Sequence, residues 1–110
     1  APVKVSRKLR QFKFKTSVTL TNDRSKKMTR LDLVTPDRRG LLVHLSQIFL
    51  KHNVNLENAK IATLGEKVED TFYVTQMKSR QRLNKEDSHK LINVICSELD
   101  MKNYKNLNVE

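Results

Sequence analysis

The residues best suited to chemistry stand in one turn, Asp37-Arg38-Arg39-Gly40-Leu41-Leu42. A strand-like segment ends just before it at Thr35-Pro36, and an apolar helical stripe follows it. Backbone N–H groups in the first turn of a helix have no partner within the helix, so they favour a carboxylate. Glycine at this point lets a ligand approach the backbone closely. The turn is a candidate ligand site, although an ordinary strand-to-helix connection has the same pattern.

The other reactive side chains do not form a set. His44 and His52 lie eight residues apart on a predicted helix, and no carboxylate is spaced to complete a metal site with them. Glu66, Glu69 and Asp70 cluster at a predicted hairpin and could hold a cation, although solvated carboxylates are common in turns. The sequence has no phosphate-binding loop, dinucleotide-binding glycine motif or nucleophile elbow. We therefore predict no catalytic residue, metal or cofactor in this chain.

Length and composition indicate one domain of 110 residues. The single cysteine, Cys96, excludes an internal disulfide, and its place in an apolar stripe predicts a core residue. No apolar run approaches the roughly 20 residues that cross a bilayer. The basic N-terminus lacks the apolar segment of a secretory signal. We expect a cytoplasmic chain with no membrane partner, cut from a longer protein.

The net charge of +10 is unevenly distributed. Residues 1–30 hold ten Lys or Arg and one acid, whereas residues 31–110 hold twelve Lys or Arg and eleven acids. The body of the domain is therefore nearly neutral, which does not favour a uniformly basic binding face. We expect residues 1–11 to be a basic linker that docks on another domain of the parent chain, with nucleic-acid binding as the weaker alternative.

Two strands are predicted near the N-terminus. Residues 12–20 alternate between apolar and polar, which is the period of a half-buried strand. Residues 28–34 repeat the pattern, with Leu31 and Leu33 inward. The short polar link between these segments favours a hairpin.

Two more strands follow the first helix. Residues 54–64 have a shift in their apolar frame between Leu56 and Ala59, which predicts a bulge. A tight turn at Gly65-Glu66-Lys67 leads into a strand over residues 68–77.

Both helices are predicted from apolar stripes and caps. Asp37 is the candidate N-cap of the first helix, which should end near His52-Asn53. Asn84 and Asp87 resemble a capping box for the second. The first stripe excludes His44, Ser46, Gln47 and Lys51 and consists of Leu41, Leu42, Leu45, Ile48, Phe49 and His52. The second consists of Leu91, Ile92, Ile95, Cys96 and Leu99.

The order β-β-α-β-β-α predicts an α+β fold with a four-stranded antiparallel sheet and two helices on one face. This is a ferredoxin-like sandwich whose last strand has moved to the front, so the first strand should lie antiparallel to the second at a sheet edge. The domain should span residues 12–100, followed by a flexible tail over residues 101–110.

Two motifs, D-x-x-G-L-L at Asp37–Leu42 and A-K-I-A-T-L-G-E-K-V-E-D-T-F-Y-V at Ala59–Val74, resemble the ACT domain family. The second motif, with R-K-L-R-Q-F at Arg7–Phe12, resembles in particular the C-terminal ACT repeat of the bifunctional uridylyltransferase/uridylyl-removing enzymes that modify the nitrogen regulator PII. The resemblance covers roughly residues 7–99.

The resemblance implies a non-catalytic regulatory domain that senses an amino acid, glutamine in this branch. Glutamine would shift the parent enzyme from uridylylation of PII to uridylyl removal. The implied partners are a neighbouring ACT repeat, other domains of the parent and, through the parent, PII. Catalysis, with Mg²⁺ in the parent, would belong to residues outside this chain.

In ACT domains the ligand lies between the strand-to-helix turn and the entry of the next strand, often across a pair of domains. Amides near Gly40 would take the ligand carboxylate, and Asp37 or Asn55 its amino or amide group. Arg39 replaces the usual proline of the D-x-P-G pattern, which puts the identity of the ligand in question. The implied site residues are Thr35, Asp37, Arg39, Gly40, Leu41, Leu42, Asn53, Val54 and Asn55.

Two alternatives remain open at this point. The domain could be a ligand-free ACT module that works by side-by-side sheet pairing, including as a homodimer. It could also bind single-stranded RNA by stacking bases on sheet aromatics. The aromatic candidates are Phe12, Phe14, Phe72 and Tyr73, of which only Tyr73 is expected on the helix-free face.

Overall fold

The structure is a computed structural model that describes residues 15–22 and 25–109, with side chains described up to residue 100. The predicted basic linker at residues 1–11 and the aromatics Phe12 and Phe14 lie outside the described residues. The elements are β1 (Ser17–Asn22), β2 (Thr29–Pro36), α2 (Leu41–Lys51), β3 (Val54–Lys60), β4 (Thr63–Leu64), β5 (Lys67–Gln76) and α3 (Lys85–Val109).

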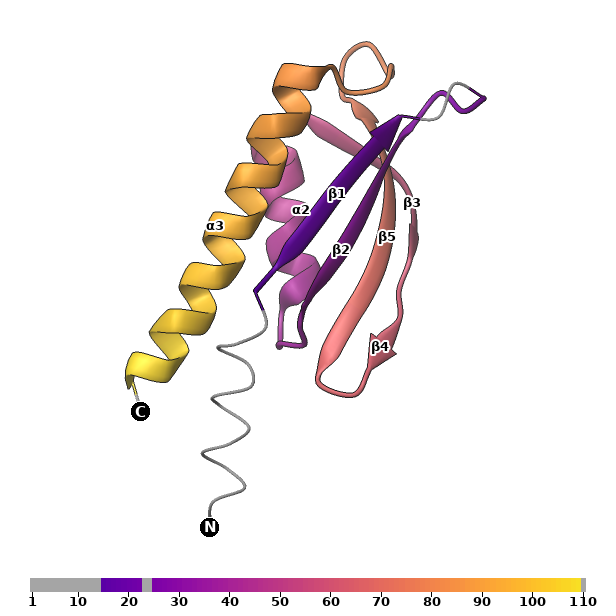
Figure 1. The fold of residues 1–110 in the computed structure, drawn as a ribbon. Helices are drawn as coiled ribbons and strands as arrows, with labels where there is room; N and C mark the ends of the chain where they lie inside the picture. Colours follow the sequence, from indigo (N-terminus) through magenta and orange to yellow (C-terminus); the bar gives the residue numbers. More distant parts are fainter. Residues whose placement is uncertain (1–14, 23–24, 110) are drawn as a thin grey trace.

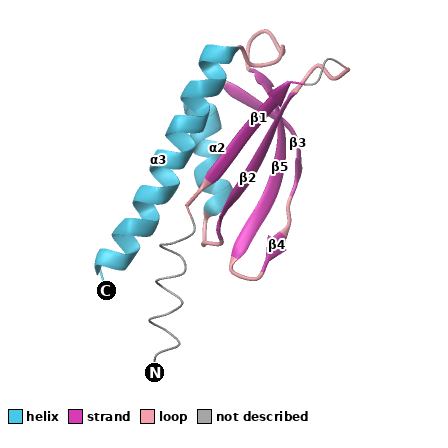
Figure 2. Cartoon of the chain, viewed as in Figure 1, coloured by secondary structure: helices cyan, strands magenta, loops and turns pink. Residues whose placement is uncertain are grey.

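The strands form one antiparallel sheet in the order β1-β2-β5-β3, with β4 also paired to β5. Both helices cover the same face of this sheet (Figures 1 and 2). The architecture is a small α+β fold compatible with a ferredoxin-like arrangement. The first strand pairs antiparallel with the second and stands at a sheet edge, as the sequence predicts.

The described sheet has five strands where the sequence predicts four, because the predicted strand 54–64 is divided. The pairing of β3 with β5 shifts register between Leu56 and Asn58, which confirms the predicted bulge. Farther along, the Ala62 N–H donates to the side-chain Oδ1 of Asp70 in β5 at 3.0 Å instead of to a backbone carbonyl. The ladder is therefore interrupted at Ile61 and Ala62 and resumes as β4.

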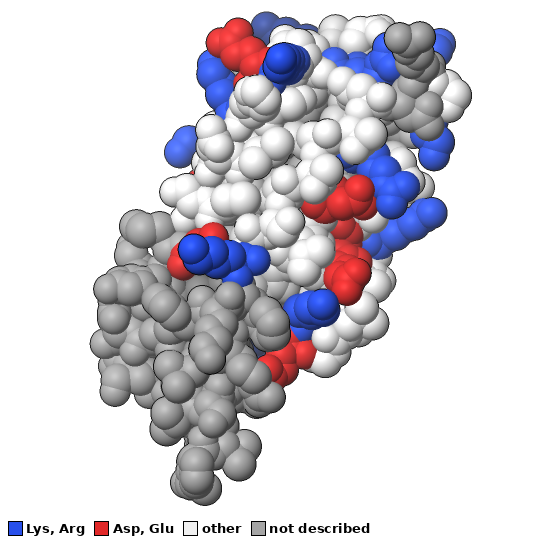
Figure 3. All heavy atoms as spheres, viewed as in Figure 1, with Lys and Arg blue, Asp and Glu red and all other residues white. Residues whose placement is uncertain are grey.

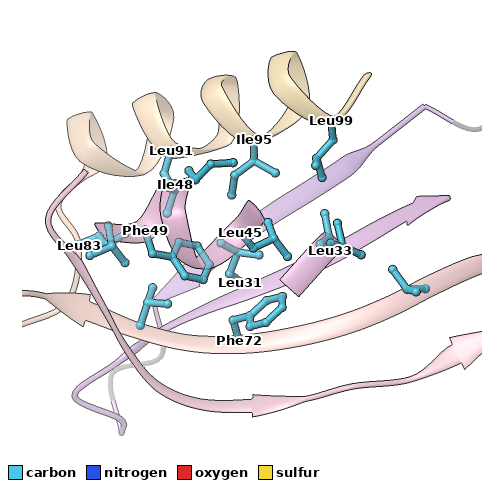
Figure 4. Packing of buried hydrophobic residues seen from close by; sticks show 14 residues of the cluster. Leu31, Leu33, Leu45, Ile48, Phe49, Phe72, Leu83, Leu91, Ile95 and Leu99 are labelled. Carbon is cyan, nitrogen blue, oxygen red and sulfur yellow. The ribbon is translucent and has the colours of Figure 1, made fainter. Parts of the chain in front are cut away.

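The core lies between the sheet and the two helices (Figure 4). Leu31 and Leu33 of β2 are fully buried, in agreement with the predicted alternation. Phe49 of α2 meets Phe72 of β5 edge to face, with ring centroids 5.7 Å apart, a favoured aromatic geometry. The buried cluster also includes Leu41, Leu45, Ile48, Val54, Val68, Val74, Leu83, Leu91, Ile95 and Leu99.

Two residues of α2 and its C-cap, His52, depart from the predicted stripe. Leu42 and His52 are exposed although the stripe includes them. His44, predicted to lie off the stripe, is half-buried and bonds through Nε2 to Glu98 Oε1 of α3 at 2.7 Å. The apolar spacing misplaced these three residues because α3 packs along one flank of α2. The buried face of α2 is therefore turned toward His44.

The second helix is longer than the sequence predicts. Its stripe ends at Leu99, but the helical backbone of α3 continues through Val109, so a helix occupies most of the predicted tail. Cys96, predicted to be a core residue, is half-buried, and its Sγ lies 3.7 Å from the carbonyl of Thr16. Burial raises the pKa of the Cys96 thiol, and the charge of Asp100 adds to the effect.

The predicted cap of α3 is confirmed, since the Asp87 N–H donates to Asn84 Oδ1 at 2.7 Å. Replacing Asn84 with alanine removes this acceptor and leaves the N–H without its side-chain partner. We expect Asn84→Ala to lower the free energy of unfolding by about 1 kcal/mol in urea titrations followed by circular dichroism. Asn93→Ala, at an exposed position within the same helix, is the control; an equal loss there would contradict the capping role.

Candidate ligand-binding site

The turn between β2 and α2 differs from the prediction at its cap. Asp37, the predicted N-cap, instead donates its N–H to the carbonyl of Glu66 at 2.8 Å, because pairing with β5 continues through Pro36. The N-cap is Gly40, in the left-handed conformation at φ 76°, and no side chain caps the helix. A Cβ at Gly40 would meet no atom within 4 Å, so the conformation rather than space requires glycine.

A cavity of about 260 Å³ opens beside this uncapped helix start. It lies between the turn, the first residues of α2, the β3–β4 connection and the beginning of β5. Its lining residues are Asp37, Arg38, Gly40, Leu41, Leu42, Val43, Ile61, Thr63, Val68 and Asp70. The cavity thus joins exposed helix amides to a partly apolar wall and to three ionisable side chains.

Asp70 is the most deeply buried of these three charges, with 2% of its surface exposed. Its Oδ1 accepts the Ala62 N–H, whereas its Oδ2 is buried without a partner among the described residues. Burial raises the pKa of the Asp70 carboxyl, and the negative charge of Asp37 raises it further, against the opposing effect of the Ala62 bond. Burying a carboxylate oxygen without a hydrogen-bond partner costs folding free energy, so Asp70 is a candidate functional residue.

Arg38 is half-buried at the same cavity. Its Nη2 donates to the carbonyl of Leu99 in α3 at 2.7 Å. Its Nε and Nη1 are buried and have no partner among the described residues. Burial lowers the pKa of Arg38, opposed by the charge of Asp100.

The predicted residues of the turn do not all reach the cavity. Asp37, Gly40, Leu41 and Leu42 line it. Thr35 is a buried residue of β2 whose Oγ1 bonds to Thr16 Oγ1 at 2.8 Å, and it does not line the cavity. Arg39 is exposed and is also absent from the lining.

Asn53, Val54 and Asn55 lie at the opposite end of α2. The helix has 11 residues, so its ends are roughly 16 Å apart. Asn53 is left-handed at φ 57°, as the predicted helix end requires, and Val54 is a core residue. Asn55 Nδ2 lies 3.5 Å from Thr75 Oγ1. Within one chain these residues do not share a cavity with the turn.

Sequence reasoning missed Arg38 and the place of Asp70 in this site. The alternation of β5 puts Asp70 on the same side as Val68, Phe72 and Val74, so a carboxyl on a buried stripe was a readable signal. Arg38 had no such signal, since two adjacent arginines look equivalent until the turn conformation is known.

The helix-free face of the sheet offers little support for RNA stacking. Tyr73 is 7% exposed, and Lys26 Nζ lies 5.1 Å from its ring centroid, so a cation occupies the place of a stacked base. On the side of the molecule drawn in Figure 3, basic and acidic side chains are interspersed. This agrees with the near-neutral charge of residues 31–110.

Within the described part of the chain, no three His, Cys, Asp or Glu side chains come together as a possible metal site. No helix over the same residues has the length and apolar character needed to span a membrane.

No protein-family model matches the chain. Curated relatives are bifunctional uridylyltransferase/uridylyl-removing enzymes. That of Ectopseudomonas mendocina is 51% identical over 72 residues, 66% of this chain and 8% of the relative. Those of Pseudomonas fluorescens and Stutzerimonas stutzeri are 41% and 40% identical over 98 and 100 residues, 89% and 91% of this chain and 11% of each relative.

The fold and cavity define a small α+β module with a candidate small-ligand site. The chain is homologous to a C-terminal part of the bifunctional uridylyltransferase/uridylyl-removing enzymes. It spans about a tenth of the length of these relatives.

The unpaired carboxyl of Asp70 predicts a pH-dependent stability difference. Because the folded chain binds this proton more tightly than the unfolded chain, the stabilising effect of protonation is lost as pH rises through the raised pKa. Asp70→Asn has no negative charge to bury at any pH. Its free energy of unfolding should match the wild type near pH 3.5 and exceed it by about 1 kcal/mol at pH 7.

The measurement is a series of urea titrations from pH 3.5 to pH 7 on both chains. Glu86→Gln, an exposed carboxylate on α3, is the matched control and should show no such trend. A difference between Asp70→Asn and wild type that does not change with pH would contradict the burial of an unpaired charge.

Proposed function

We propose that this chain is a regulatory ACT domain that senses an amino acid, with glutamine as the first candidate. In its parent enzyme it would control uridylyl transfer to, and uridylyl removal from, PII, while catalysis belongs to other parts of that enzyme. The observation that carries this proposal is the cavity at the start of α2, which combines free helix amides with unpaired buried charged atoms.

The size and chemistry of the cavity favour a small polar metabolite. Its volume of about 260 Å³ is below the range of about 300–1,000 Å³ typical of sites for drug-sized ligands. The uncapped N-terminus of α2 suits a carboxylate. Leu42, Val43 and Ile61 provide apolar contact for a short side chain.

The predicted role of Asn55 requires a second domain. Asn55 and the turn lie at opposite ends of α2, so one chain does not bring them to the same ligand. An antiparallel neighbour would place its own Asn55 beside this turn. We propose that the neighbour is another ACT repeat of the parent or a second copy of this chain.

Binding can be tested by titrating the ¹⁵N-labelled chain with glutamine to 10 mM. We expect amide shifts at Gly40, Leu41 and Leu42, because their N–H groups would contact the ligand carboxylate. Asn22 and Thr21, at the far end of the sheet, should not shift. Absence of shifts at the turn would count against ligand sensing by this chain.

A ligand-free pairing module is the second candidate, and the edge of the sheet at β3 supports it. This edge strand and the adjoining β4 segment carry the exposed apolar residues Leu56, Ile61 and Leu64. Exposed strand edges with apolar side chains favour association with another strand.

Sedimentation equilibrium of the chain tests this pairing. We expect a dimer at high protein concentration, weakened at least about tenfold by Ile61→Lys, since the ammonium would have to be desolvated in the interface. Thr19→Lys, at an exposed position of the opposite edge strand β1, is the matched control. A strictly monomeric wild-type chain would exclude self-pairing.

A further inference from the structure

We propose that Arg38 binds the α-carboxylate and Asp70 the α-ammonium of the amino-acid ligand, so that the cavity recognises a zwitterion. This inference rests on the proposed function and adds the two residues that would read the charged ends of the ligand. Neither is among the site residues that the sequence resemblance implies.

Arg38 has donor capacity that the fold leaves unused. One of its nitrogens, Nη2, holds the Leu99 carbonyl and fixes the side chain across the turn. Nε and Nη1 remain buried and unpartnered beside the uncapped start of α2. A ligand carboxylate placed there accepts from the guanidinium and from helix amides together, which are charge-assisted bonds.

Asp70 supplies the complementary unused acceptor. Its Oδ1 is committed to the Ala62 N–H, and this bond holds the carboxyl at the cavity wall. Its Oδ2 is buried and has no partner among the described residues. A ligand ammonium in the cavity would supply the partner that Oδ2 lacks.

The pair of charges favours a zwitterion over an ion of one sign. A simple anion would face Asp37 and Asp70 together, whereas a simple cation would leave the donors of Arg38 unsatisfied. A zwitterion satisfies both buried groups and adds no net charge. The Coulomb attraction at each end is enhanced because both groups are withdrawn from water.

The first test needs no variant. The chain is titrated with glutamine, with glutaramic acid, which lacks the α-amino group, and with 4-aminobutanamide, which lacks the α-carboxylate. We expect each analogue to bind at least about tenfold more weakly than glutamine, since each leaves one buried charged group unpaired. Equal binding of either analogue would overturn the assignment of the corresponding residue.

Variants then assign each charge to its residue. Asp70→Asn should lower the affinity for glutamine at least about tenfold. It should leave the affinity for glutaramic acid unchanged, because that analogue has no ammonium for Asp70 to bind. Arg38→Gln should weaken glutamine similarly and leave 4-aminobutanamide unchanged. If Arg38→Gln does not fold, Arg38→Lys, which keeps a cation near Leu99, takes its place in the same titrations. Lys51→Gln and Glu86→Gln, both exposed, are the charge-matched controls.

The outcomes separate this inference from the function on which it rests. No shift at Gly40–Leu42 with any of the three compounds would overturn both. The roles of Arg38 and Asp70 alone would be overturned if glutamine binds but the variants do not weaken it, or if each variant weakens its matched analogue as well. A loss with Arg39→Gln instead of Arg38→Gln would move the carboxylate to the exposed arginine and contradict the inference.

Discussion

The antiparallel pairing of β2 with β5 at the centre of the sheet determines the position of every part of the candidate site. The register pairs Asp70 with Leu33, a fully buried residue of the core. The same ladder ends at Pro36 opposite Lys67, which fixes where Asp37 leaves the sheet. A slip of β5 by one residue would turn Asp70 to the helix-free face together with Phe72 and Val74. The register that packs the core therefore also places the carboxylate.

The turn is also tied to elements that lie far from the cavity. Arg38 holds the Leu99 carbonyl, and the next residue, Asp100, accepts the Thr16 N–H through Oδ1 at 2.9 Å. Thr16 directly precedes β1, which begins at Ser17. A ligand carboxylate bound to Arg38 would therefore act, through the Leu99 carbonyl, on the junction of α3 with the start of β1. Differential contact of this kind is what lets a ligand shift a conformational equilibrium.

The parts of the fold that sequence predicted well are those governed by local periodicity. Leu31 and Leu33 face the core because alternation in a strand with one buried face leaves no other choice. The register shift after Leu56 and the cap at Asn84 also follow from local pattern. The prediction of Asp37 as the N-cap of α2 was wrong, because the Asp37 N–H makes a long-range bond to the Glu66 carbonyl and Asp37 stays tied to the sheet.

The candidate site was predictable only in part, for the same reason. The turn and its glycine are local features, and four of the predicted residues line the cavity. Which of two adjacent arginines faces inward depends on the left-handed Gly40 and on the position of α3, and neither is encoded in the spacing. The separation of Asn55 from the turn follows from the 11-residue length of α2, which sequence resemblance alone does not reveal.

The separation of Asn55 from the turn links ligand sensing to pairing. A single chain presents the turn, Arg38 and Asp70 at one end of α2 and Asn55 at the other. The β3 edge between these two ends is unpaired in the described sheet and bears apolar residues. Association along this edge in antiparallel fashion would cover the apolar residues and bring each Asn55 toward the partner's turn. Ligand binding would then favour the paired state, since only that state offers the ligand both walls.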